Sequence, residues 1–345
     1  MAPIPEPQRT IRSLIDAQHE KSAELPRPHM GASQLGHHCE RWLWLSFRWA
    51  VIEKFPGRIR RLFRRGHEEE KNFISDLEMI GVKFENHQEY IDFGGHVGGS
   101  TDGTINSGVP GAERTRHVAE FKTHSEKSFS DLQKKGVLES KPMHWAQMQL
   151  YMLGTRIDRA LYVAVCKNDD QLYTERVNFN KEAAEKLLQR GKRLAKSERM
   201  PEPISTDPSW YQCKFCAAHS FCHETKLTKE VNCRTCAHAT PEDDSSWSCA
   251  RWESDNIPVE WQHKGCDSHV LHPDLVPWQR KPSNTPHEAV YEIAGKDIRN
   301  GEADAFCFGS KEIIIGGEDC ANDAVQAVRA EFPGAKIEEA DEVPF

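Results

Sequence analysis

Residues 117–123 read HVAEFKT, and this short stretch indicates both a fold class and a candidate site. Val118 and Phe121 are apolar anchors, so the stretch predicts a strand. Side chains alternate between the two faces of a strand, which places Glu120 and Lys122 on the same face. Many strands carry such a pair as a solvent-facing ion pair, so the stretch alone leaves a structural and a functional interpretation open.

The surrounding sequence alternates between helical and extended patterns. Periodicity and turn residues predict helices at 33–50, 57–80, 144–154 and 181–198, and strands at 82–93, 96–105, 160–166 and 172–179, the last two joined as a hairpin. This order predicts an α/β fold with one mixed central sheet flanked by helices. Further strands are expected at 289–295, 302–309, 311–317 and near Lys336–Ile337, with a helix at 319–332, as a small α+β C-terminal region.

Charge is distributed unevenly along the 345 residues. The net charge of −8 argues, taken alone, against a nucleic-acid partner. Residues 1–200, however, carry 32 Lys and Arg against 27 Asp and Glu, whereas residues 201–345 carry 13 against 26. A mildly basic part and an acidic part are expected to have different partners. No apolar run reaches the roughly 18 residues of a membrane span.

Asp102, in GGSTDG at 98–103, is expected to bring a second carboxylate close to Glu120. Carboxylate oxygens are ligands that suit Mg²⁺ or Mn²⁺. Such a metal polarises a phosphate and lowers the pKa of a bound water, and a lysine can orient that water and stabilise developing charge. The pattern is therefore consistent with phosphodiester hydrolysis.

Six motifs in a fixed order make the sequence resemble the RecB-like branch of the PD-(D/E)xK nucleases, in particular the iron–sulfur exonucleases of CRISPR-associated and phage type and the AddB nuclease domain. The motifs are Cys39, His67, Asp102, Glu120–Lys122, Gln147–Tyr151 and Cys213–Cys216–Cys222. The resemblance covers about residues 31–225 and implies a restriction-endonuclease-like fold. It also implies a metal-dependent DNA exonuclease, acting on ends or single strands in recombination or repair and plausibly encoded by a phage.

The resemblance also implies roles for individual residues. The expected metal ligands are His67, Asp102, Glu120 and the carbonyl of Phe121, with Lys122 as the catalytic lysine and Gln147 and Tyr151 as residues that position DNA or that lysine. For His67 the alternative is a solvated surface position beside Glu68, Glu69 and Glu70. For Gln147 and Tyr151, four residues apart on one helical face, the alternative is ordinary packing.

Eleven cysteines without the apolar core of a secretory signal predict a reducing, cytoplasmic setting in which thiols bind metals. By the resemblance, Cys39, Cys213, Cys216 and Cys222 hold a [4Fe–4S] cluster; a four-cysteine zinc site is the alternative. A second set, Cys233, Cys236, Cys249 and Cys266, is spaced like a zinc ribbon. Since about forty residues bury little core, Zn²⁺ is expected to stabilise this module.

Arginines form the densest basic run just before His67: Arg58, Arg60, Arg61, Arg64 and Arg65. Arginine binds phosphate bidentately, so DNA contact is predicted here, with a solvated helix face as the alternative. The last residues are Asp341, Glu342, Val343, Pro344 and Phe345, which resemble the acidic tip of bacterial single-stranded-DNA-binding proteins and imply host repair proteins as partners. A frayed, charged end is the alternative.

These features divide the sequence into an arm at 1–30, a nuclease domain at 31–228, a zinc-binding module at 229–280, a small α+β region at 281–338 and an acidic tip at 339–345. The leading hypothesis is a Mg²⁺- or Mn²⁺-dependent deoxyribonuclease. The rival hypotheses are a non-catalytic DNA-binding adaptor or inhibitor that engages host repair proteins, and a zinc-only DNA-binding protein.

Overall fold

The computed structural model describes residues 10–338, which form two compact units. The first unit comprises the described residues up to His37 together with Glu53–Phe93 and Val97–Gly191. The second comprises His38–Ile52, Gly94–His96 and the described residues from Lys192 onward. Each unit is therefore assembled from separate segments of the chain, and each is described by itself.

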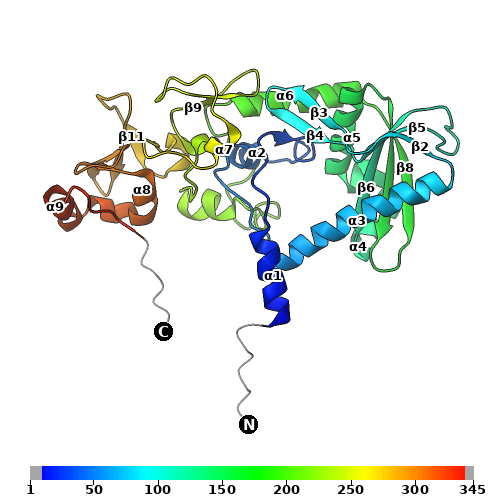
Figure 1. Ribbon diagram of the computed structural model, residues 1–345, viewed down its shortest axis with the longest axis horizontal. Coiled ribbons are helices and arrows are strands. Elements are labelled where there is room, and N and C mark those ends of the chain that lie inside the picture. Colours follow the sequence, from blue (N-terminus) through cyan, green and yellow to red (C-terminus); the bar gives the residue numbers. More distant parts are fainter. Residues whose placement is uncertain (1–9, 339–345) are drawn as a thin grey trace, which may run out of the picture. The chain divides into compact units, whose positions relative to one another are not determined.

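The first unit is built on a five-stranded sheet with the strand order β2-β5-β6-β7-β8 (Figure 1). Its strands are β2 (Lys83–Asn86), β5 (Gly103–Ser107), β6 (His117–His124), β7 (Arg159–Cys166) and β8 (Leu172–Asn178). The β6–β7 pair is parallel and the other pairs are antiparallel, which confirms the predicted mixed sheet. A second sheet joins β1 (Met30–Gly31), β4 (Val97–Ser100) and β3 (Tyr90–Gly94).

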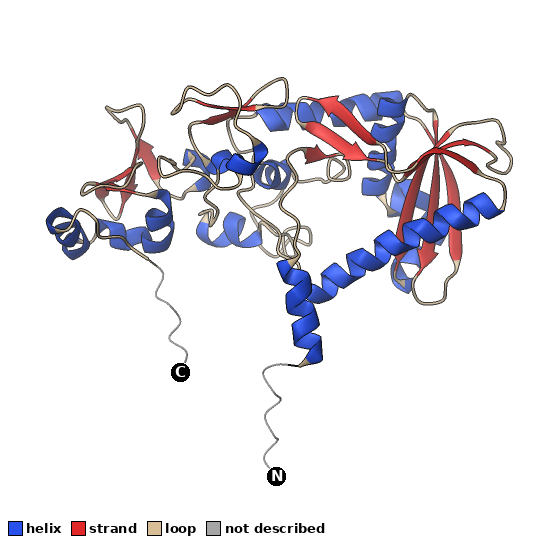
Figure 2. Cartoon of the chain, viewed as in Figure 1, coloured by secondary structure: helices blue, strands red, loops and turns tan. Residues whose placement is uncertain are grey.

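Helices cover both faces of the five-stranded sheet (Figure 2). They are α3 (Gly57–Met79), α4 (Glu126–Ser140) and α5 (Pro142–Thr155); α1 (Ile11–Lys21) packs against α3, and α6 (Lys181–Lys196) follows β8. On the α3 face, Phe73 packs with Phe121 and Val163 in one core cluster. Because strand side chains alternate, Glu120 and its β7 partner Tyr162 belong to the opposite face, which α5 covers.

The helices predicted at 57–80, 144–154 and 181–198 and the hairpin of β7 and β8 are confirmed. The helix predicted at 33–50 is shorter, because α2 spans only Glu40–Phe47. Cys39 ends the preceding turn, and its sulfur accepts a hydrogen bond from the backbone N–H of Trp42 at 3.5 Å, which caps the helix. None of the helices within residues 10–338 is long and apolar enough to cross a membrane.

Around the second cysteine set, the second unit has a core of aromatic rings and arginines. Its short elements here are a π-helical turn (Phe221–Thr225), a 3₁₀ turn (Cys233–Thr235), β9 (Ala239–Pro241), β10 (Trp247–Cys249), α7 (Val259–Gln262) and a 3₁₀ turn (Pro273–Leu275). The guanidinium of buried Arg234 lies 3.8 Å from the ring centre of Trp49 and 4.9 Å from that of Trp247. Trp247 is 1% exposed, so this stretch contributes a large aromatic side chain to a core that it shares with Trp49.

The C-terminal part of the second unit is a small α+β structure. A four-stranded sheet contains β11 (Gln279–Lys281), β12 (Ala289–Ile293), β13 (Lys296–Asn300) and β14 (Cys307–Phe308), and α8 (Ser310–Gly316), a 3₁₀ turn (Gly317–Ala321) and α9 (Asp323–Glu331) follow. The strand predicted at 311–317 is wrong, because those residues form α8. The strand predicted at 302–309 is limited to β14, and residues 336–337 form no strand.

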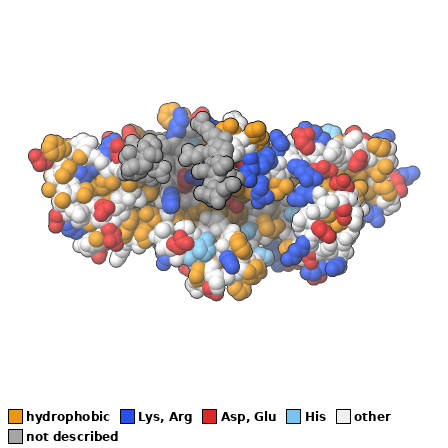
Figure 3. All heavy atoms as spheres, turned by 90° about the horizontal axis from the view of Figure 1, so that it is seen from below, with side chains coloured by type: hydrophobic (Ala, Val, Ile, Leu, Met, Phe, Trp, Pro, Cys, Tyr) orange, Lys and Arg blue, Asp and Glu red, His pale blue; other side chains and the backbone are white. Residues whose placement is uncertain are grey.

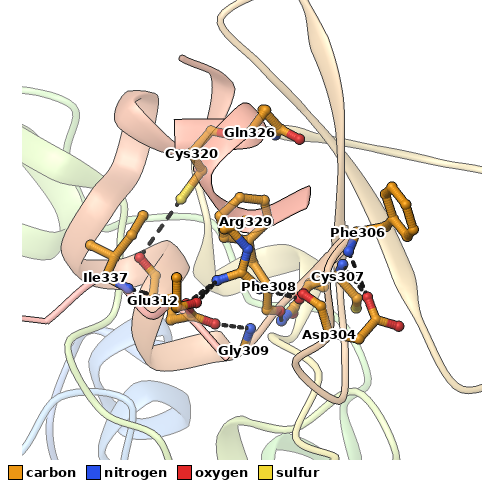
Figure 4. Close-up of polar contacts among 12 residues, drawn as sticks. Asp304, Phe306, Cys307, Phe308, Gly309, Glu312, Cys320, Gln326, Arg329 and Ile337 are labelled. Carbon is orange, nitrogen blue, oxygen red and sulfur yellow. Dashed lines mark hydrogen bonds and ion pairs between the residues drawn. The ribbon is translucent and has the colours of Figure 1, made fainter. Parts of the chain in front are cut away.

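Buried Arg329 explains the correction at 311–317 (Figure 4). It forms an ion pair with Glu312 and donates to the backbone carbonyls of Asp304 and Cys307 at 2.6 and 2.8 Å. Glu312 also accepts from the N–H of Gly309 at 2.8 Å, which caps α8 at its start. These tertiary contacts require a helix at 310–316, whereas the isoleucine run alone favours a strand.

Candidate active site

Asp102 is held against strand β6 by a backbone hydrogen bond. It directly precedes β5, which pairs antiparallel with β6 so that Gly103 lies opposite Ala119. One carboxylate oxygen, Oδ2, accepts a hydrogen bond from the N–H of Phe121 at 2.7 Å. The strand register therefore brings the carboxylate of Asp102 to the part of β6 that carries Glu120 and Lys122, as the sequence predicts.

Lys122 connects the two carboxylates. Its Nζ forms an ion pair with Glu120, lies 3.7 Å from Oδ2 of Asp102 and donates to the carbonyl of Phe121 at 3.0 Å. The Phe121 carbonyl, a predicted ligand, therefore faces the same site. This pair is not a solvent-facing ion pair, because the side chain of Glu120 is 0% exposed.

The carboxylate of Glu120 is only partly satisfied. Both of its oxygens are buried; Oε1 is contacted by the ammonium of Lys122, whereas Oε2 has no hydrogen-bond partner within the described residues. Burial raises the pKa of Glu120 to about 8; the charge of Lys122 opposes this shift and that of Asp102 adds to it. A buried acceptor without donors is unfavourable unless a cation or water binds it, so the donor set fits a divalent metal ion.

The ionisation of Lys122 follows from the same contacts. Burial lowers the pKa of its ammonium group, but the charges of Glu120 and Asp102 outweigh this and raise the pKa above its ordinary value. Lys122 therefore stays charged and is the cation that balances the two carboxylates in the described structure. One positive charge against at least two acidic groups leaves the site attractive to a further cation.

Glu70, on α3, is a candidate site residue that the sequence reasoning missed, because it lies within electrostatic range of Asp102 and Lys122. Burial raises its pKa and the nearby charge of Asp102 raises it further, while Lys122 lowers it. Its Oε2 accepts from the side-chain amide of Gln88 at 3.3 Å. The sequence did contain an indication of this position. Glu70 precedes Phe73 and Ile74 by three and four residues, so it lies on the same side of the helix as these two residues, which pack against the sheet.

His67 lies one helical turn from Glu70 and is 72% exposed. Its Nδ1 is 3.4 Å from Oε1 of Glu70, whose side chain is only 22% exposed. His67 thus contacts Glu70, and the charge of Asp102 raises the pKa of Glu70. Its predicted role as a metal ligand stays a prediction.

Gln147 and Tyr151 face the site from α5. The Gln147 side chain hydrogen-bonds to the Tyr151 hydroxyl, and the pKa of that hydroxyl is raised by burial and then by the charges of Glu120 and Asp102. Tyr151 packs closely against Gly99 of β4, where an added Cβ would lie 2.7 Å from the tyrosine oxygen. The Tyr151 hydroxyl is therefore within electrostatic range of the two carboxylates, and the positioning role of Gln147 and Tyr151 stays a prediction.

A buried chain of polar groups lies on the same face of the sheet as Lys122. The hydroxyl of Tyr162 lies 2.8 Å from Nε2 of His124 and 2.9 Å from Nδ1 of His144. Burial lowers the pKa of His124 to about 4 and that of His144 to about 3, and the charge of Lys122 contributes to both shifts. The sequence reasoning did not identify this chain, since neither histidine has metal-like spacing.

The described residues contain no group of three or more His, Cys, Asp or Glu side chains arranged to hold one metal ion. In the candidate active site, the ammonium of Lys122 contacts both Asp102 and Glu120. Carboxylates that could bind a metal are therefore present in this site. In the described structure, however, their negative charge is balanced by Lys122.

Both cysteine sets belong to the second unit, but within residues 10–338 neither is arranged to hold a single metal ion. Burial raises the pKa of Cys216 to about 11, and the charges of Cys39, Cys222 and Cys213 raise it further. In the other set, burial raises the pKa of Cys233 to about 11, and the charges of Cys266 and Cys249 raise it further. Burial also raises the pKa of Cys236, as do the charges of Cys266 and Cys233. None of the eleven cysteines, all within residues 10–338, forms a disulfide.

The arginine run divides into two groups on α3. Arg61 pairs with Asp16 of α1, and Nε of Arg60 donates to the carbonyl of Phe55 at 3.1 Å, so both have structural contacts. Arg58, Arg64 and Arg65 are exposed. Figure 3 shows Lys and Arg side chains gathered on part of the face seen from below. The predicted tip, Asp341–Phe345, lies outside the described residues.

A family model described as the PD-(D/E)XK nuclease superfamily matches residues 8–223. No curated protein matches the chain. Three solved structures show partial similarity: SSO0001 (16% identity, 62% of this chain and 97% of the other, TM-score 0.39), LHK-Exo in complex with dAMP (15%, 52% and 89%, TM-score 0.36) and an alkaline exonuclease, LHK-Exo, from Laribacter hongkongensis (15%, 52% and 90%, TM-score 0.32). These low scores add nothing to the match of the family model.

Proposed function

The chain belongs to the PD-(D/E)XK nuclease superfamily, and from this premise we propose that it is a metal-dependent exonuclease that hydrolyses phosphodiester bonds of DNA. The observation that carries the proposal is buried Glu120: its Oε1 pairs with Lys122 beside Asp102, and its Oε2 has no hydrogen-bond partner in the described residues. A protein that had lost nuclease activity would not need to retain Asp102, Glu120 and Lys122 together. Their presence therefore disfavours a non-catalytic adaptor.

The metal would be Mg²⁺ or Mn²⁺, held by oxygens of Asp102, Glu120 and Glu70 and by the Phe121 carbonyl, with His67 as a further ligand implied by the resemblance. When bound, it would supply a Lewis acid and lower the pKa of a water molecule. Lys122 would then be released from balancing the carboxylates and would stabilise negative charge on the phosphate.

Gln147 and Tyr151 would hold the substrate or Lys122 in position. The Gln147 hydrogen bond orients the Tyr151 hydroxyl, and the raised pKa of that hydroxyl keeps it protonated, so it remains a hydrogen-bond donor. A neutral donor beside Glu120 and Asp102 can orient a phosphate oxygen without adding charge to the site.

DNA would approach the site along α3. Arg58, Arg64 and Arg65 are exposed on the helix that also carries Glu70. At 1.5 Å per residue, Arg58 and Glu70 are separated by about 18 Å along the helix axis, a span of several nucleotides. Exposed guanidinium groups along this span would bind successive phosphates and direct the strand toward the carboxylates.

We also propose that Cys39, Cys213, Cys216 and Cys222 hold a [4Fe–4S] cluster and that Cys233, Cys236, Cys249 and Cys266 hold Zn²⁺. The support is chemical, since the pKa values of Cys213, Cys216 and Cys222 and of Cys233 and Cys236 are raised by burial and by neighbouring cysteines of the same set, and a bound cation would stabilise their thiolates. In a [4Fe–4S] cluster each thiolate binds a different iron atom. Cys39, Cys213, Cys216 and Cys222 therefore need not surround a single ion.

A role in recombination or repair follows from the resemblance alone, as does recruitment of host repair proteins by the C-terminal tip. Deleting Pro344 and Phe345 is expected to weaken binding to a repair protein that recognises such tails. A pull-down in which the truncated and the full-length chain are retained equally would contradict the role of the tip.

The exonuclease proposal is tested with linear and covalently closed circular DNA of the same sequence, in Mg²⁺ or Mn²⁺ and with protein purified without oxygen. The expected result is loss of end label from linear single- or double-stranded DNA, intact circles and no reaction in EDTA. Cleavage of the circular DNA would contradict the exonuclease proposal. If both the linear and the circular DNA stayed intact, the result would favour the DNA-binding adaptor.

A further inference from the structure

Three aromatic rings are exposed on the segment that carries the Cys213–Cys216–Cys222 motif. Trp210 is 43% exposed, Tyr211 is 67% exposed and Phe215 is 85% exposed. Exposed aromatic side chains concentrated within six residues contribute little to folding, because they bury little apolar area. Exposed apolar groups gathered on one short segment are typical of a binding surface. We call Trp210, Tyr211 and Phe215 the aromatic surface.

The backbone under the aromatic surface is held by tight turns. The N–H groups of Cys213 and Lys214 donate to the carbonyl of Trp210 at 2.8 and 2.9 Å, and that of Cys216 donates to the carbonyl of Cys213 at 3.0 Å. Cys213 is buried, and Cys216 packs against the core cluster that contains Trp44. The cysteines thus face inward and the rings outward, so the rings are presented by an ordered segment rather than by a loose one.

Ring geometry and charge favour a polyanion with planar groups as the ligand. The rings of Trp210 and Tyr211 have centroids 5.1 Å apart, and Nζ of Lys214 lies 5.6 Å from the ring centre of Phe215. The two nearby carboxylates have local contacts: Asp207 accepts from Ser209 at 2.7 and 2.8 Å, and Glu224 lies 3.5 Å from His219. A cation therefore lies beside the rings, while Asp207 and Glu224 are held in local contacts with Ser209 and His219.

We propose that the aromatic surface binds unpaired bases of a single DNA strand, an inference that rests on the proposed nuclease function. Every base has a π-face, so stacking on Trp210, Tyr211 and Phe215 would tolerate any sequence, and Lys214 would contact the backbone phosphate. An apolar protein segment is a poorer match, because the exposed set is aromatic and adjoins a cation. Duplex DNA offers such rings only its terminal base pairs.

The test compares the full-length chain with the triple variant Trp210→Ala, Tyr211→Ala, Phe215→Ala. Binding of fluorescein-labelled oligo(dT) and of a blunt duplex of equal length is measured by anisotropy in EDTA, so that no cleavage occurs. The Kd for oligo(dT) is expected to rise about tenfold or more, and that for the duplex less than about twofold. The matched control, Phe306→Ala with Phe332→Ala, removes rings that are 66% and 59% exposed and is expected to bind like the wild type.

A second variant separates binding from folding. Trp210→Phe, Tyr211→Phe and Phe215→Tyr together keep three rings and are expected to retain affinity for oligo(dT). Equal binding of oligo(dT) by the wild type and the triple alanine variant would overturn the inference, as would equal weakening of single-stranded and duplex binding. Degradation of end-labelled DNA in Mn²⁺ by the same wild-type preparation tests the proposed function independently.

Discussion

At the scale of single residues, burial determines the behaviour of Glu120. Its carboxylate is enclosed, its pKa is raised to about 8, and Lys122 provides the only counter-charge recorded at contact distance among the described residues. A buried carboxylate with one oxygen unpartnered becomes an effective metal ligand once a divalent cation is present, because the metal supplies the partner that Oε2 lacks.

Replacing Glu70 with Gln is expected to reduce metal-dependent cleavage at least about tenfold at low Mn²⁺. The amide can keep the contact with Gln88 but removes the negative charge beside Asp102. The rate is measured against Mn²⁺ concentration, with Glu68→Gln as the control, because exposed Glu68 pairs with Lys71 on the same helix. An unchanged Mn²⁺ dependence would remove Glu70 from the site.

His144 is expected to make the protein sensitive to acid. Its pKa is lowered to about 3 by burial and by the charges of Lys122, His124 and Lys141, whereas an unfolded histidine binds a proton near pH 6.5. Between these values only the unfolded chain is protonated, so the free energy of unfolding falls as the pH falls from about 6.5 toward 3.

The variant His144→Gln can hydrogen-bond to Tyr162 without titrating. Its loss of stability between pH 7 and pH 5 is expected to be smaller than that of the wild type by up to about 2 kcal/mol. Urea unfolding in EDTA at both pH values measures this difference, with exposed His87→Gln as the control. Parallel losses in the wild type and His144→Gln would contradict the assignment.

At the scale of elements, the site depends on close packing between β4 and α5. Gly99 leaves room for the Tyr151 hydroxyl, since an added Cβ would lie 2.7 Å from its oxygen and 3.2 Å from Cβ of Ala32. The motif GGSTDG, which contains Gly99, therefore contributes packing space as well as Asp102.

Gly99→Ala is expected to destabilise the protein by about 1–3 kcal/mol and to displace Tyr151. Urea unfolding and nuclease rate are measured together, and adding Tyr151→Phe should restore part of the stability, because it removes the nearest atom. Gly66→Ala is the matched control, since nothing lies within 4 Å of an added Cβ there. Equal stability of Gly99→Ala and the wild type would show that the packing is adaptable.

Elements with strong local patterns were predictable from the sequence, and elements decided by tertiary contacts were not. The 3.6-residue period of α3 and α6, the apolar anchors of β6 and the apolar run of β7 predicted those elements, and the two-residue period of a strand predicted the shared face of Glu120 and Lys122. The helix α8 depends on Arg329 and Glu312, whose contact links residues 17 positions apart, so its isoleucines misled the prediction. Glu70 was missed because three consecutive glutamates resemble a solvated surface.

At the scale of the whole molecule, the chain combines the candidate nuclease site of the first unit with two cysteine sets in the second. The net charge of −8 conceals the basic character of residues 1–200, where the arginines of α3 lie. The net charge of the whole chain is therefore a poor indicator of its partners. The local positive charge on α3 is the better basis for the proposed binding of DNA.

Metal analysis of anaerobically purified protein is expected to find about four iron atoms and one zinc ion per chain. Cys213→Ser should lower iron and leave zinc, whereas Cys249→Ser should lower zinc and leave iron, because each removes one thiolate from a different set. Zinc without iron in the wild type would contradict the cluster and favour two zinc sites.

The most direct test of the central claim is the rate at which end label is released from linear DNA in Mn²⁺. Glu120→Ala and Lys122→Ala are compared with the wild type and with Lys135→Ala, which removes a surface lysine paired with Asp131 at 2.9 Å. We predict that the wild type and Lys135→Ala degrade the DNA at the same rate, while both site variants lose about 100-fold or more with their iron–sulfur absorbance intact. Wild-type rates in either Glu120→Ala or Lys122→Ala would contradict the catalytic assignment.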